Sequence, residues 1–67
     1  MSDLTEKLLL TAEEVAHQLS VSTKTLDTWR RTEKGPPFIR LSGMGGGRGV
    51  RYRLDELKQW IEEQRAP

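Results

Sequence analysis

Two short amphipathic segments, residues 12–19 and 23–34, are joined by only three residues, and this constrains the fold more than any other feature of the sequence. In each segment apolar residues recur at the three- and four-residue spacing of one helix face. Because the connection over residues 20–22 is so short, we expect the two helices to pack against each other at an angle. The sequence thus predicts a helix pair with a tight turn.

The first segment carries clear signals for the start of a helix. Thr11 and Glu14 form a capping box, in which each side chain satisfies a backbone N–H group of the other residue. The apolar face expected over residues 12–19 consists of Ala12, Val15, Ala16 and Leu19. His17 lies outside this face and has no second ligand or nucleophile partner, so we interpret it as solvated or adjacent to phosphate rather than catalytic.

The second segment is polar on one side in a way that suits contact with DNA. Leu26 and Trp29 are three residues apart and form its apolar face. Lys24 and Arg31 lie almost opposite that face, where their cationic groups can donate to phosphates and base edges. We therefore predict that residues 23–34 form a recognition helix, capped at its start by a serine.

The stretch after this helix predicts a hairpin. Gly35 suits the position just past a helix end, and the two prolines that follow it cannot continue the helix. Residues 38–41 and 50–53 are expected to be strands, the second of which alternates apolar and basic side chains. Five of the eight residues between them are glycine, so we expect a flexible wing tip whose one charged residue is Arg48.

The two ends of the chain complete the predicted architecture. Residues 1–9 are expected to be a flexible lead-in, and Leu8 and Leu10 to form a short extended piece on the core. Residues 54–64 predict a third helix with a weak N-cap. Its expected apolar face consists of Leu54, Leu57, Trp60 and Ile61. The predicted fold is one mainly α-helical domain over residues 1–67, a winged helix-turn-helix of three helices and a two-stranded antiparallel hairpin at residues 38–53.

Composition excludes several classes of site. The 67 residues include no cysteine and one histidine, which excludes disulfides, thiolate metal sites and multi-histidine sites, so no metal or cofactor is expected. No apolar run approaches the roughly 20 residues that span a bilayer. The N-terminus is acidic and lacks the basic start of a signal peptide. We therefore expect a cytoplasmic protein without membrane contact.

Charge is distributed unevenly along the chain. The net charge is +1, but residues 22–53 carry eight Lys and Arg against two Asp and Glu, a net charge of +6. The flanking residues 1–21 and 54–67 carry net charges of −3 and −2. A basic block of this kind is typical of a polyanion-binding surface, although a merely solvated face would have the same composition.

Taken in order, several segments resemble one known family. They are VSTKTLDTWRRTEKGPP, FIRL, the glycine and arginine tip, and VRYRLDELKQWI. From residue 10 to residue 61 the chain is similar to the small MerR-like winged helix-turn-helix domains of phage excisionases and AlpA-type regulators. The matching positions are residues 11–14, Val21, Ser22, Thr25, Trp29, Gly35, Pro37, Arg40, Arg51, Arg53, Leu57 and Trp60.

The resemblance implies a protein that binds specific sequences in double-stranded DNA and bends them, with the second helix in the major groove and the wing at an adjacent minor groove. It implies an excisionase, or recombination directionality factor, which binds direct repeats and directs a phage integrase toward excision in a bacterial host. A small AlpA-like or MerR-like transcriptional regulator is the alternative. The compact size, and the missing coiled-coil extension after Gln64, favour an excisionase whose monomers associate cooperatively on DNA.

The donor-bearing side chains are assigned to two kinds of DNA contact. Candidates for base edges are Thr23, Lys24, Thr28 and Arg31. Candidates for phosphates are Lys24, Arg30, Arg31, Lys34, Arg40, Arg51 and Arg53. Arg48 is a candidate for a narrow minor groove, with a solvated tip as the alternative, and Ser22 and Thr25 complete the predicted DNA-binding set. Asp27 either orients Arg31 as an i, i+4 partner, which we favour, or accepts from a cytosine amino group.

Two other classes of protein compete with DNA binding. An enzyme is disfavoured because the glycine run lacks the P-loop pattern, and a GxGxxG fit from Gly43 would need glycine where Arg48 stands. A protein-binding adaptor domain stays open as the second class. Trp29 and Trp60 suit base stacking by chemistry, but both fall on the apolar face of their helix, so we assign them to the core.

Overall fold

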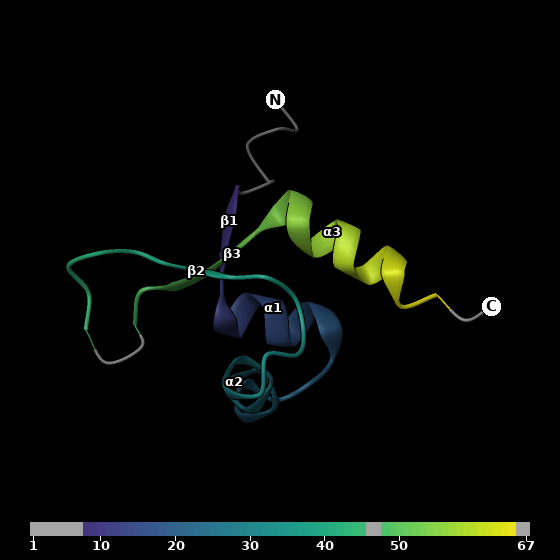
Figure 1. Ribbon diagram of the computed structural model, residues 1–67, viewed down its shortest axis with the longest axis horizontal. Helices are drawn as coiled ribbons and strands as arrows, with labels where there is room; N and C mark the ends of the chain where they lie inside the picture. Colours follow the sequence, from purple (N-terminus) through teal and green to yellow (C-terminus); the bar gives the residue numbers. More distant parts are fainter. Residues whose placement is uncertain (1–7, 46–47, 66–67) are drawn as a thin grey trace.

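The computed structural model describes residues 8–45 and 48–65 and shows three helices around a small sheet (Figure 1). The elements in chain order are β1 (Leu9–Thr11), α1 (Ala12–Leu19), α2 (Thr23–Arg31), β2 (Ile39–Arg40), β3 (Val50–Arg53) and α3 (Leu54–Glu63). This arrangement confirms the predicted class, a mainly helical fold with a β wing. Most of the expected lead-in (residues 1–7) and part of the expected wing tip (residues 46–47) lie outside the described residues.

Helix α1 begins as its capping box predicts. The backbone N–H of Glu14 donates to the Thr11 hydroxyl over 3.1 Å, and the N–H of Thr11 donates to Glu14 Oε1 over 2.9 Å. The helix ends at Leu19 because Ser20 adopts a left-handed conformation with a φ of 58°. The turn predicted over residues 20–22 therefore follows directly, and it brings α2 against α1.

Helix α2 is three residues shorter than predicted. It ends at Arg31 because Glu33, with a φ of 59°, takes the left-handed position just past the helix. The N–H of Lys34 then donates to the carbonyl oxygen of Trp29 over 2.7 Å, which satisfies one of the terminal carbonyls. The prediction that Gly35 holds this position is wrong.

Gly35 instead makes a second turn beside Trp29. Its φ is 80°, and an added Cβ would lie 2.7 Å from the Trp29 ring atom Cε3. A side chain here would therefore meet both an unfavourable backbone conformation and an occupied space. Glycine lets the chain turn directly against the indole and continue toward β2.

The sheet has three strands rather than the two predicted, in the order β1-β3-β2. Strand β1 pairs antiparallel with β3, with Leu10 opposite Tyr52, and β2 pairs with the other edge of β3, with Ile39 opposite Arg51. Leu10 packs on the core as predicted, whereas Leu8 is 85% exposed, so its predicted packing is wrong. Three residues that run directly into a helix cap are too few for alternation to reveal a strand.

The wing hairpin is present, with its first strand shorter than expected. Strand β2 covers two residues of the predicted 38–41, while β3 coincides with the predicted 50–53. The N–H of Leu41 donates to the carbonyl oxygen of Gly49 over 2.8 Å, which extends the pairing toward the tip. A Cβ on Gly49 would lie 2.7 Å from the Leu41 carbonyl oxygen, so glycine allows this close approach.

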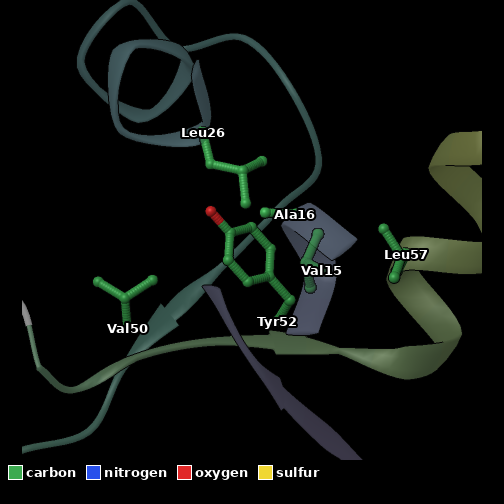
Figure 2. Packing of buried hydrophobic residues seen from close by; sticks show 6 residues of the cluster. All are labelled: Val15, Ala16, Leu26, Val50, Tyr52 and Leu57. Atoms are coloured by element: carbon green, nitrogen blue, oxygen red, sulfur yellow. The ribbon is translucent and has the colours of Figure 1, made fainter. Parts of the chain in front are cut away.

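The core lies where the helices meet β3 (Figure 2). Its buried residues are Val15, Ala16, Leu26, Val50, Tyr52 and Leu57. Each helix contributes at least one of these residues, so burial of this cluster holds all three helices against β3. Trp29 packs against the cluster, and its ring centroid lies 5.8 Å from that of Trp60, which agrees with a core role for this pair.

Helix α3 packs through fewer apolar residues than predicted. Leu57 is buried and Leu54 is half-buried, but Ile61 is 42% exposed, so its predicted burial is wrong. Ile61 lies in the last turn of α3, which projects past α1 and α2 (Figure 1). The N-cap Arg53 makes no side-chain capping bond, in agreement with the weak cap expected there.

Candidate nucleic-acid interface

Helix α2 presents a polar face on the side away from the core. Leu26 is fully buried and Trp29 is half-buried, which confirms the predicted apolar face. The exposed side chains of the helix are Thr23, Lys24, Thr28 and Arg31. The four residues predicted to reach base edges are therefore all accessible on the outer side of one nine-residue helix.

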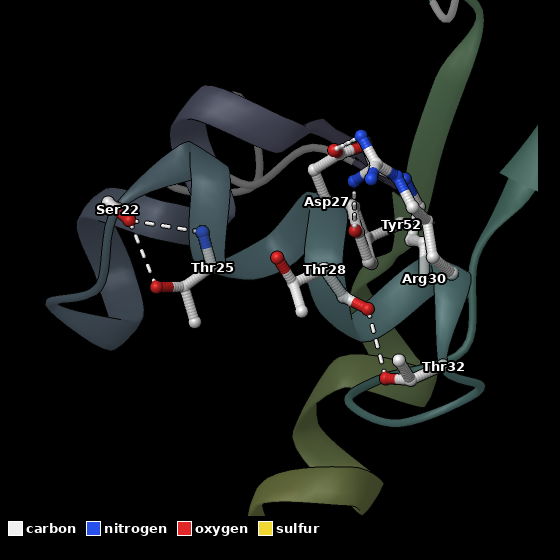
Figure 3. A network of polar contacts seen from close by, with 8 residues as sticks. Ser22, Thr25, Asp27, Thr28, Arg30, Thr32 and Tyr52 are labelled. Atoms are coloured by element: carbon white, nitrogen blue, oxygen red, sulfur yellow. Dashed lines mark hydrogen bonds and ion pairs between the residues drawn. The ribbon is translucent and has the colours of Figure 1, made fainter.

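Ser22 and Thr25 organise the first turn of α2 (Figure 3). The backbone N–H of Thr25 donates to Ser22 Oγ over 3.0 Å, and the two hydroxyl oxygens are also 3.0 Å apart. Both hydroxyls are thus engaged within the cap. These contacts fix the start of the helix that carries Thr23 and Lys24. The DNA contacts expected of Ser22 and Thr25 stay predictions.

Asp27 pairs with arginines on its own helix. Its Oδ2 accepts from Arg31 Nη2 over 2.7 Å, and its Oδ1 accepts from Arg30 Nη2 over 3.3 Å. The Arg31 side chain stays 76% exposed while it makes this contact. The geometry agrees with the favoured interpretation of Asp27 as the i, i+4 partner of Arg31, because both carboxylate oxygens already have donors.

Arg30 faces the interior rather than the solvent. Its side chain is 14% exposed, Nη1 donates to the Tyr52 hydroxyl over 2.8 Å, and its Cζ lies 5.9 Å from the centroid of the Phe38 ring. These contacts leave little of the guanidinium for the predicted phosphate contact. Sequence reasoning missed Tyr52 as its partner. The available signal was the alternation in β3, which points Tyr52 inward, where a buried phenol needs a hydrogen-bond partner.

The wing carries its arginines in different environments. Arg48 is exposed near the tip, as predicted. Arg51 is half-buried, and its Nη1 donates to the carbonyl oxygens of Arg48 and Val50 over 2.7 and 2.9 Å. Arg40 is exposed, with its Cζ 5.3 Å from the centroid of the Phe38 ring. Arg51 therefore supports the base of the wing tip, whereas Arg40 and Arg48 offer free surface charge.

A hollow of about 370 Å³ lies between helices α1 and α2 and the wing. Its lining residues are Thr11, Ala12, Glu13, Thr23, Arg30, Arg48, Val50 and Arg51. The start of α1 and two residues of α2, Thr23 and Arg30, therefore face Arg48 and Arg51 of the wing across this space. Four of the predicted DNA-binding residues meet here, although they come from α2 and from the wing some 20 residues later.

Two predicted contacts lie apart from this hollow. Arg53 forms an ion pair with Asp55 at 3.5 Å and lines a different hollow, which is bordered mainly by Leu8, Leu9, Ile39 and Leu54. Lys34 is exposed in the turn after α2. Among the described residues, neither lines the hollow between the helices and the wing.

Within residues 8–45 and 48–65, no three His, Cys, Asp or Glu side chains gather closely enough to hold a metal ion. In the same residues no helix is long and apolar enough to span a membrane.

A match to the helix-turn-helix domain family covers residues 9–65. The chain belongs to the helix-turn-helix domain family. Membership of this family implies that the protein binds DNA, and domains of this kind are typically non-enzymatic. No match was found among the curated proteins or among the solved structures.

The two helices and the turn of a helix-turn-helix domain correspond to elements described above. Its two helices are α1 and α2, separated by the turn at residues 20–22. In such domains the second helix lies in the major groove and contacts base edges with its N-terminal residues, while the first crosses the backbone. Helix α2 is the second helix of this pair, and its first turn carries Thr23 and Lys24.

Proposed function

We propose that this helix-turn-helix protein binds specific sequences in double-stranded DNA, with α2 in the major groove and the β2–β3 wing at the adjacent minor groove. The observation that carries the proposal is the polarity of α2. Leu26 is 0% exposed on one side, while the Arg31 side chain is 76% exposed on the other. Donor groups on that outer face suit phosphates and the acceptor edges of guanine.

The proposed contacts divide by position. The base-edge set is Thr23, Lys24, Thr28 and Arg31, all exposed on α2. Phosphate contacts are proposed for Lys34, Arg40, Arg51 and Arg53, and a minor-groove contact for Arg48. Arg30 is left out because Tyr52 and Asp27 already hold its guanidinium.

We further propose that the biological role is that of an excisionase, which binds direct repeats as cooperating monomers, bends the DNA and directs a phage integrase toward excision. Support comes from the resemblance to phage excisionase domains. A small transcriptional regulator of the AlpA or MerR type is the second candidate, because the same fold and the same exposed face serve that role equally.

A salt titration tests the DNA-binding proposal. If about five phosphates are neutralised, the logarithm of the affinity for duplex should fall with the logarithm of the salt concentration at a slope of about −4.5. Fluorescence anisotropy with a labelled random duplex, starting near 50 mM salt, measures this slope. Absence of binding at the lowest salt concentration would contradict the proposal and favour the protein-binding adaptor.

Footprinting on the genomic region around the gene separates the two biological roles. Protection of direct repeats beside a phage attachment site supports the excisionase. Protection over a promoter instead supports the regulator and contradicts the excisionase proposal.

A further inference from the structure

A continuous chain of polar contacts links the core to the outer face of α2. The Tyr52 hydroxyl accepts from Arg30 Nη1 over 2.8 Å, and Arg30 Nη2 lies 3.3 Å from Asp27 Oδ1. Asp27 Oδ2 then accepts from Arg31 Nη2 over 2.7 Å. Figure 3 shows Arg30 between Tyr52 and Asp27, so three contacts connect a residue of β3 with an exposed arginine of α2.

Each inner member of this chain has little conformational freedom. Tyr52 is 1% exposed, so its ring is fixed by core packing and its hydroxyl has a fixed position. Arg30 is 14% exposed in its side chain, so its guanidinium is held by the acceptors around it rather than by water. Asp27 divides its two oxygens between Arg30 and Arg31, and this fixes the plane of its carboxylate. The outermost member, Arg31, therefore attaches to a rigid base.

We propose that Tyr52 is a positioning residue for sequence recognition, which acts through Arg30 and Asp27 to hold the Arg31 guanidinium in the orientation used for a base edge. This inference rests on the proposed function and adds how the proposed recognition helix holds Arg31 in place. A free arginine loses much rotamer freedom on binding, whereas a preorganised planar fork loses less per hydrogen bond formed. The Tyr52 hydroxyl should therefore raise the affinity for a specific sequence, whose base edges need a fixed donor orientation, more than the affinity for unrelated DNA, which depends on attraction to phosphates.

Tyr52 also links the wing to α2. Tyr52 lies on β3, the strand that leads directly from the wing tip and Arg48. The same residue therefore joins the wing strand to the recognition helix. The orientation of Arg31 then depends on correct placement of β3, so the two DNA-contacting parts are coupled through one hydroxyl.

The conservative variant Tyr52→Phe tests the proposal because it keeps the ring and removes the hydroxyl. Binding is measured to a duplex enriched by the wild-type protein from a random pool and to an unrelated duplex of equal length. Loss of one hydrogen bond in the chain should weaken binding to the enriched duplex about 3- to 10-fold, with less than about 2-fold change on the unrelated duplex. Ile61→Val is the control, since it alters an exposed apolar side chain of α3 outside the chain of contacts and should leave this ratio unchanged.

A double-variant cycle shows whether Tyr52 acts through Arg31. In the background of Arg31→Ala, Tyr52→Phe should cause no further loss on the enriched duplex. An undiminished loss in that background would overturn the proposal, because the hydroxyl would then act by another route. Equal binding of wild type and Tyr52→Phe to both duplexes would also overturn it.

Asp27→Asn breaks the chain at a half-exposed residue and covers the case in which Tyr52→Phe folds poorly. It should lower the ratio of specific to unrelated binding, and the ¹⁵Nε order parameter of Arg31 in the free protein should fall. An unchanged order parameter together with an unchanged ratio contradicts the proposal. If the wild-type protein binds no duplex, the proposed function fails and this inference fails with it. If the wild-type protein binds DNA but the variants keep its ratio of specific to unrelated binding, only this inference fails.

Discussion

The indole of Trp29 lies 5.8 Å from that of Trp60, centroid to centroid, with the two ring planes tilted by 48°. Aromatic pairs at this separation and tilt are favourable beyond the area that they bury. The contact joins α2 to α3, two helices separated by the whole wing in the sequence. It therefore fixes α2 from the side that also carries Leu26.

Removing one member of this pair should loosen the fold. Trp60→Ala is expected to lower the free energy of unfolding by about 2–3 kcal/mol, because it loses both apolar burial and the ring contact. Urea denaturation followed by circular dichroism measures the change. Ile61→Ala, at a 42% exposed position of the same helix, is the control and should cost less than about 1 kcal/mol. Equal losses would contradict the structural importance of the pair.

Gly35→Ala should destabilise the protein more than Gly43→Ala. The two glycines have nearly the same φ, 80° and 85°, so both substitutions carry a similar backbone cost of about 1 kcal/mol. At Gly35 the new Cβ would also lie 2.7 Å from the Trp29 ring, whereas nothing lies within 4 Å at Gly43. Thermal unfolding of the two variants isolates this steric contribution, and identical melting temperatures would show that Trp29 moves aside freely.

The parts of the fold that the sequence predicts are those with local signals. The capping box of Thr11 and Glu14, the serine cap of α2 and the alternation of β3 each depend on residues close in the chain, and all three are confirmed. The outer face of α2 was predictable for the same reason, since the helix period alone places Arg31 on the same side as Lys24.

The missed features depend on residues far apart or on competing local preferences. Strand β1 exists because β3 offers it a partner, and Leu10 is opposite Tyr52 only in the folded chain. Arg30 is drawn inward by Tyr52, 22 residues later, which no local pattern of α2 could indicate. At the end of α2, Glu33 takes the left-handed position although glycine prefers it, and Gly35 lies two residues later, against Trp29.

Arg48→Ala should weaken binding to any duplex modestly. If Arg48 neutralises one phosphate or enters a narrow minor groove, its loss should reduce the magnitude of the salt slope by about 1. Anisotropy titrations at several salt concentrations measure the slope. Arg65→Ala removes another exposed cation, just after the end of α3, and should leave the slope unchanged. A slope unaffected by Arg48→Ala would remove the wing tip from the interface.

Arg30→Ala and Arg31→Ala should differ in their effect on stability, although the two residues are adjacent and both belong to the chain of contacts that starts at Tyr52. Arg31→Ala is expected to leave the melting temperature nearly unchanged and to weaken an enriched duplex more than an unrelated one, by about 1–3 kcal/mol. Arg30→Ala is expected to lower stability by about 1–3 kcal/mol, because it leaves the buried Tyr52 hydroxyl without its donor. Differential scanning calorimetry measures the stability of each variant, and binding curves on the two duplexes measure its specific and unrelated affinity. Equal loss of specific and unrelated binding in Arg31→Ala would mark it as a phosphate contact.

The most direct test of the account is an NMR titration of the ¹⁵N-labelled protein with duplex DNA at low salt. The amide resonances that shift most should belong to Thr23, Lys24 and Thr28 on α2 and to the wing around Arg48, while those in the last turn of α3 should stay in place. Shifts concentrated on α3, with the outer face of α2 unaffected, would contradict the claim that α2 is the surface that meets DNA.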